Sequence, residues 1–241
     1  LSFMATTASA QQFRSLGNFG IGFSCGTRTA ISNDGTTVIG VEVTASWQGN
    51  PPIYNSFYWK TGWLQLPQPI TTIQILDKPA GLLNPSMAKD VSADGNTIIA
   101  DAYLFGAGYR SYVWNQGTGG TITTSILPFN GNLGLGAQAV SGDAKKIVGL
   151  AFSQVYIWNQ TTGQMTQVSN TTGLTVRPKA MSLDGEAFIS TVFGFSDYEA
   201  TYWDSTGGVY LSMGSLIPGH INPNSEGHDI TPDGTMAVGF S

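Results

Sequence analysis

The sequence carries little charge. Only 10% of its 241 residues are Asp, Glu, Lys or Arg, and the formal net charge is −5. A nucleic-acid partner would need a stripe of Lys and Arg to neutralise phosphates, whereas the one adjacent basic pair here is Lys145-Lys146. We therefore expect no nucleic-acid binding. A surface so poor in charge is unusual for a cytoplasmic enzyme, so we expect an extracellular or cell-surface location.

Long apolar runs, cysteine pairs and helix-forming segments are also missing. No apolar run reaches the roughly 20 residues of a membrane-spanning helix, so we expect no membrane insertion. Cys25 is the single cysteine, which excludes an internal disulfide and favours a buried small side chain over a nucleophile. The chain has 31 Gly and many Thr and Ser, a composition that predicts an all-β fold with almost no helix.

One motif recurs along the chain. It has the form [Ala/Asp]-[Ile/Val/Met]-[Ser/Thr]-x-Asp-[Gly/Ala]. Its five copies are residues 30–35, 90–95, 139–144, 180–185 and 229–234. Their Asp residues are separated by 60, 49, 41 and 49 positions, close to the period of about 40–50 residues that is typical of propeller blades. The motif therefore predicts a repeat architecture.

The residues of this motif are those of a tight turn. Asp and Ser side chains accept hydrogen bonds from nearby backbone N–H groups, and Gly supplies a positive φ. We expect these turn residues to be structural: Ser32, Asp34, Gly35, Ser92, Asp94, Gly95, Ser141, Asp143, Ser182, Asp184, Gly185, Thr231, Asp233 and Gly234. The alternative is calcium binding, but each loop offers one carboxylate where Ca²⁺ takes 6–8 oxygens. We predict no metal and no cofactor.

Each repeat also has an apolar, β-branched segment and then an aromatic run that ends in Trp. The four runs end at Trp59, Trp114, Trp158 and Trp203. A polar turn and a weaker strand follow each Trp. This order predicts a blade of four antiparallel strands.

The two ends of the chain complement each other. The last repeat stops after its second strand, whereas residues 2–6 and 12–17 align with residues 56–60 and 63–67 of the first repeat, with Ala5 in place of Trp59. We predict a five-bladed β-propeller in which one blade is built from both termini. The expected single domain, 1–241, has these repeats: 28–68, 88–129, 137–169, 178–213, and a split blade of 228–241 plus 1–17.

Two alternatives remain at the termini. The last blade could be completed by the N-terminal strands of another copy, which would propagate a fibre if the arrangement does not close. Residues 1–10 also resemble the tail of a signal peptide, with Ala8-Ser9-Ala10 as a cleavage site. The repeat alignment favours a strand, and the high local concentration of a tethered strand favours closure within one chain.

Candidate ligand contacts are few. His220 and His228 lie close in sequence to Glu226 and Asp229, which could hold a metal or form a hydrolase site, or could simply share an inter-blade loop. Aromatic rings could stack on sugars, which would make a carbohydrate-binding propeller. The aromatic candidates for that role are Trp47, Trp59, Trp114, Trp158 and Trp203.

The repeats resemble a known family. The pattern Ala-x-x-Val-Ser-x-Asp-Gly, followed by Val-Ile-Gly and then a small residue, an aromatic and Trp, is similar to the HAF-type repeats of bacterial proteins predicted to be extracellular. The chain lacks the His-Ala-Phe tripeptide and has Asn55-Ser56-Phe57 in its place. The resemblance implies a propeller and export, and it supplies no catalytic residues. The resulting expectation is a non-enzymatic structural or interaction module that self-associates, with a glycan-binding propeller as the alternative.

Overall fold

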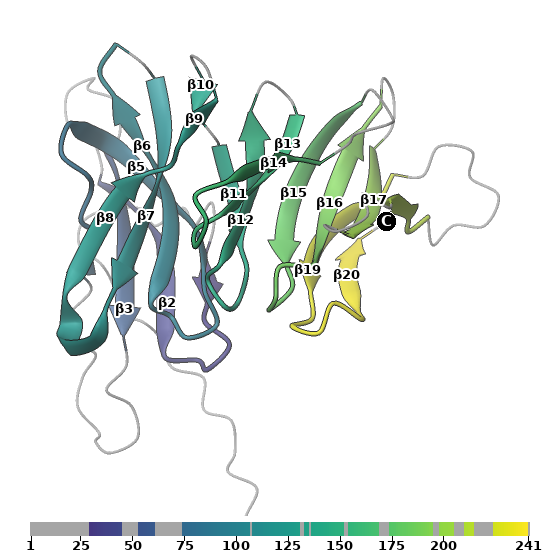
Figure 1. Cartoon of the computed structure of the whole chain (residues 1–241), viewed down its shortest axis with the longest axis horizontal. Helices are drawn as coiled ribbons and strands as arrows, with labels where there is room; N and C mark the ends of the chain where they lie inside the picture. Colours follow the sequence, from purple (N-terminus) through teal and green to yellow (C-terminus); the bar gives the residue numbers. More distant parts are fainter. Residues whose placement is uncertain are drawn as a thin grey trace, which may run out of the picture.

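We analysed a computed structural model of the chain (Figure 1). The structure describes residues 29–44, 53–60, 74–106, 108–130, 133–134, 136–151, 154–168, 174–194, 198–204, 210–214 and 224–240. The predicted N-terminal half of the split blade, Trp47 and His220 lie outside these residues.

Four sheets of the same design follow one another along the chain. Each is a four-stranded antiparallel meander in which sequence neighbours pair. The first sheet contains β1 (Ala30–Ile31), β2 (Thr37–Thr44), β3 (Ile53–Lys60) and β4 (Gln74–Ile75). The second contains β5 (Leu82–Val91), β6 (Thr97–Leu104), β7 (Gly108–Gln116) and β8 (Ile122–Ile126). The third contains β11 (Gly136–Val140), β12 (Lys146–Ala151), β13 (Gln154–Asn159) and β14 (Met165–Gln167). The fourth contains β15 (Thr175–Met181), β16 (Ala187–Phe193), β17 (Tyr198–Asp204) and β18 (Tyr210–Ser212).

The remaining elements are short. A hairpin of β9 (Phe129–Asn130) and β10 (Leu133–Gly134) lies between the second and third sheets in sequence. The last sheet has two strands, β19 (Glu226–Ile230) and β20 (Ala237–Phe240). Within the described part of the chain, the one helical element is a 3₁₀ turn, η1 (Thr118–Gly120), and no helix is long and apolar enough to cross a membrane. The all-β prediction is confirmed, with four complete blades and a two-stranded sheet.

Apolar contacts between the faces of neighbouring sheets form the core. Tyr58 of the first sheet packs on Trp114 of the second, with ring centroids 4.7 Å apart. Ile99 of the second sheet packs in one cluster with Ile147 of the third. Analogous clusters join the third sheet to the fourth and the fourth to β19–β20. Because both faces of the second strand meet a neighbour, β6, β12 and β16 are buried along most of their length.

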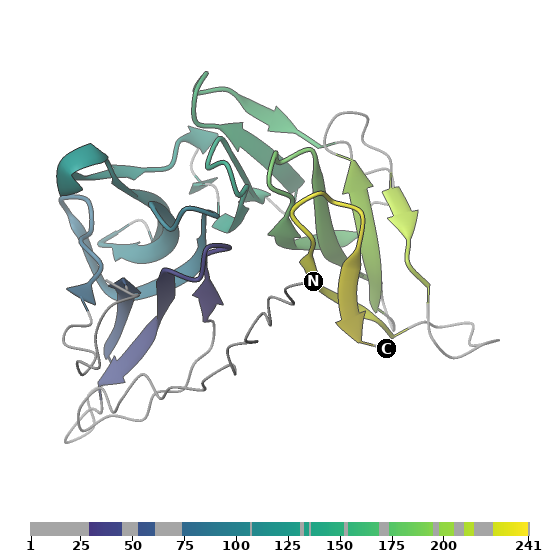
Figure 2. The same cartoon turned by 90° about the horizontal axis from the view of Figure 1, so that it is seen from below.

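The sheets lie in an arc around a central space. Figure 2 shows β1 and β2 (purple) at one end of the arc and β19 and β20 (yellow) at the other. The first strand of each sheet is innermost, and residues from the first-strand segments of all five sheets line one cavity of ≈ 740 Å³. The five motifs therefore surround a common site.

Candidate functional site: the motif turns and the central cavity

Each copy of the motif folds into the same turn between the first and second strands. In the first copy, the Ser32 hydroxyl donates to Asp34 Oδ1 at 2.6 Å and accepts the Thr37 N–H at 2.9 Å, while Asp34 Oδ1 accepts the Thr36 N–H at 2.9 Å. The other four turns repeat all three bonds within 2.5–3.1 Å, with Thr231 in the place of serine in the last one. Ser and Asp are thus engaged in holding the turn.

The hydrogen bonds lower the pKa of all five carboxyl groups. The Ser32 hydroxyl and the Thr36 N–H lower the pKa of the Asp34 carboxyl from its usual 3.8. At Asp94 and Asp143, burial raises the carboxyl pKa, but the hydrogen bonds outweigh it and the net pKa is lowered. The pKa values of Asp184 and Asp233 are also lowered, the first chiefly by the Glu186 N–H and the second by the Thr231 hydroxyl. These groups are therefore acceptors rather than proton donors at neutral pH.

The third turn departs from the others at its last motif position. Gly35, Gly95, Gly185 and Gly234 have φ between 67° and 71°, whereas Ala144 occupies the same position with φ 61°. A side chain in this left-handed region clashes with its own backbone, so Ala144 is strained.

Relief of that strain can be measured. We expect Ala144→Gly to raise the free energy of unfolding by about 1 kcal/mol, and Gly35→Ala to lower it by about the same amount. Gly35 is the matched control because a Cβ there meets no atom within 4 Å, so only backbone strain is added. The measurement is urea denaturation followed by tryptophan fluorescence. Destabilisation by Ala144→Gly would show that the methyl packing outweighs the strain.

Hydrogen bonds also join the turns into one rim. Asp34 N donates to Ala93 O at 3.3 Å, Ala93 N to Gly142 O at 2.9 Å, and Leu183 N to Pro232 O at 2.7 Å. Between the third and fourth sheets, Asp143 N donates to Leu183 O at 2.8 Å. The series runs from the first turn to the fifth, and therefore ties all five sheets together at this end.

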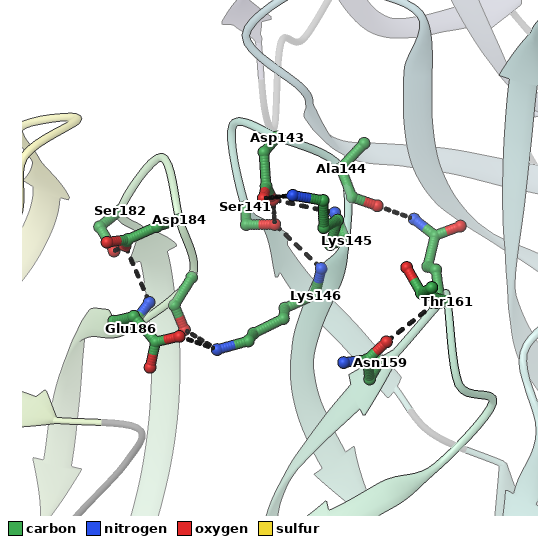
Figure 3. Close-up of polar contacts among 12 residues, drawn as sticks. Ser141, Asp143, Ala144, Lys145, Lys146, Asn159, Thr161, Ser182, Asp184 and Glu186 are labelled. Carbon is green, nitrogen blue, oxygen red and sulfur yellow. Dashed lines mark hydrogen bonds and ion pairs between the residues drawn. The ribbon is translucent and has the colours of Figure 1, made fainter.

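Side chains reinforce the joint between the third and fourth sheets. Figure 3 shows Lys146 reaching from the third sheet to Glu186 of the fourth. The Lys146 ammonium lies 2.6 Å from Glu186 Oε1 and 3.5 Å from Gly185 O. The Lys146 side chain is partly buried. The pair therefore links the two turns through both side-chain packing and charge attraction.

Asp90 makes a further contact between sheets. It occupies the first motif position, where three of the copies have Ala. Its Oδ1 accepts the N–H of Val91, and its Oδ2 accepts the N–H of Val140 in the third sheet, both at 2.9 Å. Asp229 stands in the same position of the last sheet, and its Oδ1 accepts the Ile230 N–H at 2.8 Å. The sequence analysis did not predict this contact. The presence of Asp instead of Ala at the first motif position was the feature that could have indicated it.

The tryptophans proposed as sugar contacts lie inside the fold. Trp114 and Trp203 are buried, with 0% and 1% of their surface exposed. Trp203 stacks on Phe188 with ring centroids 5.7 Å apart, and its indole N–H donates to Ser190 Oγ at 2.6 Å. Trp59 and Trp158 are half-buried. Trp114 and Trp203 therefore present no exposed ring face for stacking on a sugar, because the aromatic strand packs against the neighbouring sheet.

The histidine cluster is only partly described. His228 Nε2 lies 3.9 Å from Glu226 Oε2, and its ring is 5.2 Å from the Phe240 ring. In the described part of the chain, no three His, Cys, Asp or Glu side chains are placed to hold a metal ion. His228 and Asp229 do line the central cavity, together with Lys89, Asp90 and Lys179. Within the described residues, these polar groups gather around the central cavity.

Comparison with solved structures identifies the architecture. No protein-family model and no curated protein matches the chain. A TolB from Acinetobacter baumannii is similar over 77% of this chain, at 16% identity and a TM-score of 0.54. A protein described as a TolB from Agrobacterium tumefaciens is similar over 88%, at 15% identity and a TM-score of 0.58. The chain folds as a β-propeller.

The propeller fold is also shared with much larger enzymes. The tricorn protease is similar over 78% of this chain, at 10% identity and a TM-score of 0.51, but this match covers only 22% of that enzyme. The chain spans 42% of the Acinetobacter TolB and 68% of the Agrobacterium protein. At these identities the likeness extends to the fold alone.

Proposed function

We propose that this propeller has five blades, that residues 1–17 complete the last one, and that the closed ring is a non-enzymatic structural or interaction module. The observation that carries the proposal is that, among the strands that the structure describes, β20 pairs on one side only, with β19, and its apolar side chains are exposed. The low charge of the sequence supports an extracellular or cell-surface location for this module.

The exposure of Val238 is unlike that of its counterparts. Val238 is 61% exposed. The residues in the same position of the other second strands are Ile39, Ile99, Val148 and Ile189, exposed by 1%, 0%, 0% and 0%. Those four side chains pack against the third strand of their own sheet and against the next sheet. Met236 and Phe240 are likewise 65% and 50% exposed. An apolar unpaired edge of this kind is a template for strand addition.

The sequence of residues 2–6 fits that edge. In the first sheet, Gly40 pairs with Phe57, and a Cβ on Gly40 would lie 2.6 Å from the Phe57 ring. The repeat alignment places Phe3 opposite Gly239 in the same way, so the small residue of the second strand again faces an aromatic ring. The register also sets Met4 against Val238, which would cover its side chain.

Closure would extend two contacts already seen between the other sheets. Asp229 is equivalent to Asp90, whose Oδ2 accepts a backbone N–H from the next sheet. In a closed ring the next sheet after β19–β20 is the first one, so Asp229 would accept from β1. Similarly, Asp233 N would donate to Asn33 O and complete the hydrogen-bonded rim. Both termini of the arc already line the same cavity through Ile31 and Ile230.

A non-enzymatic role is supported by the hydrogen bonds that the repeated motif residues make. The Ser and Asp side chains of the five turns bond to one another and to backbone N–H groups, and the carboxylates stay ionised. This arrangement stabilises the scaffold, and within the five turns it leaves no side chain free to act as an acid–base pair. Glycan binding remains the second candidate; it would need contacts other than Trp114 and Trp203.

The mass and shape of the purified protein test the proposal. By light scattering and negative-stain electron microscopy, we expect particles of one chain with a closed ring outline. Regular fibres or large assemblies would show instead that the edge of β20 takes its third strand from another copy, and self-assembly would then be the function. Monomers with an open arc would contradict both forms of the proposal.

A further inference from the structure

The outer strand of the second sheet, β8, has an unpaired edge. It pairs with β7 on one side, and no other strand in the described part of the chain pairs with it. The outer strands β4, β14 and β18 of the other complete sheets have two or three residues, whereas β8 has five. Short outer strands protect a blade against pairing with another chain. Figure 1 shows β8 on the outer side of the molecule, at the end away from β19 and β20.

The composition of β8 favours the addition of a strand. Its sequence is Ile-Thr-Thr-Ser-Ile, in which four of the five residues are β-branched, and Ile122 and Ile126 are each 38% exposed. Edge strands in natural proteins often carry a charged residue, especially Lys, that prevents such pairing. Residues 111–142 contain no Asp, Glu, Lys or Arg. The strand therefore presents a neutral edge, although the whole chain has a net charge of −5.

Alternate residues of β8 direct their backbone polar groups to the open side. On one flank of the strand, the Gly117 N–H donates to Thr121 O at 2.8 Å. On the other flank, the Leu127 N–H donates to Ser111 O at 2.9 Å. Hydrogen-bonded positions alternate along an antiparallel pair, so the odd-numbered residues of β8 face β7. The even-numbered residues, with Thr124 at the centre, therefore point their N–H and C=O groups away from the sheet.

The residue pattern of β8 is symmetric about Thr124. If a second β8 strand lies antiparallel to the first, with a two-fold axis at Thr124, then Thr124 faces its own copy. Ile122 then faces Ile126 of the other strand, and Thr123 faces Ser125. Thr–Thr and Thr–Ser neighbours stabilise antiparallel pairs, and the facing isoleucines would cover each other's apolar surface. The strand is thus complementary to itself in both its side chains and its outward backbone groups.

We propose that β8 pairs with the β8 strand of a second copy of the chain, antiparallel about Thr124, and so forms a two-fold dimer. A two-fold contact is closed, so it gives dimers and not fibres. One pair of five-residue strands is smaller than a standard stable interface, so single chains dominate in dilute samples. The dimer rests on the proposed role as an interaction module and specifies its partner. It does not depend on how the last blade is completed, because β8 belongs to a complete sheet.

Sedimentation velocity of the full chain, between about 1 μM and about 1 mM, tests the proposal. We expect a monomer–dimer equilibrium within this range. The double variant Ile122→Lys, Ile126→Lys should raise the dimer dissociation constant about tenfold or more, because each introduced ammonium group would face another across the axis. Two added lysines reduce the net negative charge of the chain, so general repulsion cannot account for such a loss.

The double variant Ile122→Lys, Ile126→Glu is the matched control. It changes the same two positions, but in the antiparallel register each introduced ammonium group would face an introduced carboxylate. We therefore expect this variant to dimerise at least tenfold more tightly, by about that factor, than the variant with two lysines. Thermal unfolding checks that both variants keep the fold.

The proposal is overturned if the parent chain stays monomeric up to the highest concentration, which would also be the result if another segment of the chain covered β8. It is equally overturned if the two double variants dimerise with the same affinity, since the proposed register requires them to differ. Failure of ring closure would instead produce assemblies that need residues 1–17 and do not respond to the β8 substitutions, so the two proposals fail in distinguishable ways.

Discussion

Replacement of Val238 by aspartate should lower the free energy of unfolding by about 2–4 kcal/mol. The loss is expected because in the closed ring this side chain would pack between the third strand of its own blade and the first sheet, as Ile99 packs against the third sheet, and a carboxylate there would have no partner. The measurement is urea denaturation of the variant and the parent. Without a covering strand, Val238 is 61% exposed, and a substitution at such a position normally changes stability by less than about 0.5 kcal/mol.

Leu211→Asp is the control for this experiment. Leu211 lies on β18, the outermost strand of the fourth sheet, and is 56% exposed. It has nearly the same exposure as Val238 but no missing neighbour in a four-stranded blade. We expect little change for Leu211→Asp. Equal, small effects at both positions would mean that nothing covers β20.

Deletion of residues 1–17 should have a larger effect. The deletion would uncover Met236, Val238 and Phe240, and each apolar side chain of this size contributes about 1.5–3 kcal/mol when buried. The total is comparable with the whole stability of many domains, which is about 5–15 kcal/mol. We therefore expect a truncated chain that unfolds at a much lower temperature and binds hydrophobic dyes at its open edge.

Adding the deleted segment back as a peptide distinguishes loss of the closing strands from non-specific destabilisation of the truncated chain. A synthetic peptide of residues 1–17, added to the truncated chain, should restore thermal stability in proportion to its concentration. The same peptide with Phe3→Asp should not, because its charged side chain would face Gly239. A truncated chain that is as stable as the parent, and monomeric, would contradict the proposed closure.

The repeating fold could be predicted from the sequence because its determinants are local. Asp34 and Gly35 lie within one turn, and their hydrogen-bonding and conformational preferences act over a few residues. The aromatic run ending at Trp114 likewise marks one strand. The number of complete blades depends on which segment pairs with the outer edge of β20. Under the proposed closure that segment is the N-terminus, which is far from β20 in sequence, so local patterns do not determine the pairing.

The site was less predictable for two physical reasons. The register shift between Ala88 and Asp90 depends on how β5 pairs with β6, and the sequence analysis did not address that pairing. The direction of an aromatic side chain depends on which face meets the neighbouring sheet, so Trp203 could be read as a sugar contact when it is in fact buried against Phe188. The central cavity itself exists only because five distant segments come together.

A pair of cysteines tests the central claim most directly. Met4→Cys and Val238→Cys, in a chain with Cys25→Ser, would place two thiols on facing strands, at a separation where cross-strand pairs can form a disulfide. Non-reducing electrophoresis and intact mass should show an internal disulfide in a monomer, and Met4→Cys with Leu211→Cys should show none. Disulfide-linked dimers and ladders, or no disulfide at all under oxidation, would contradict closure of the ring by the chain's own N-terminus.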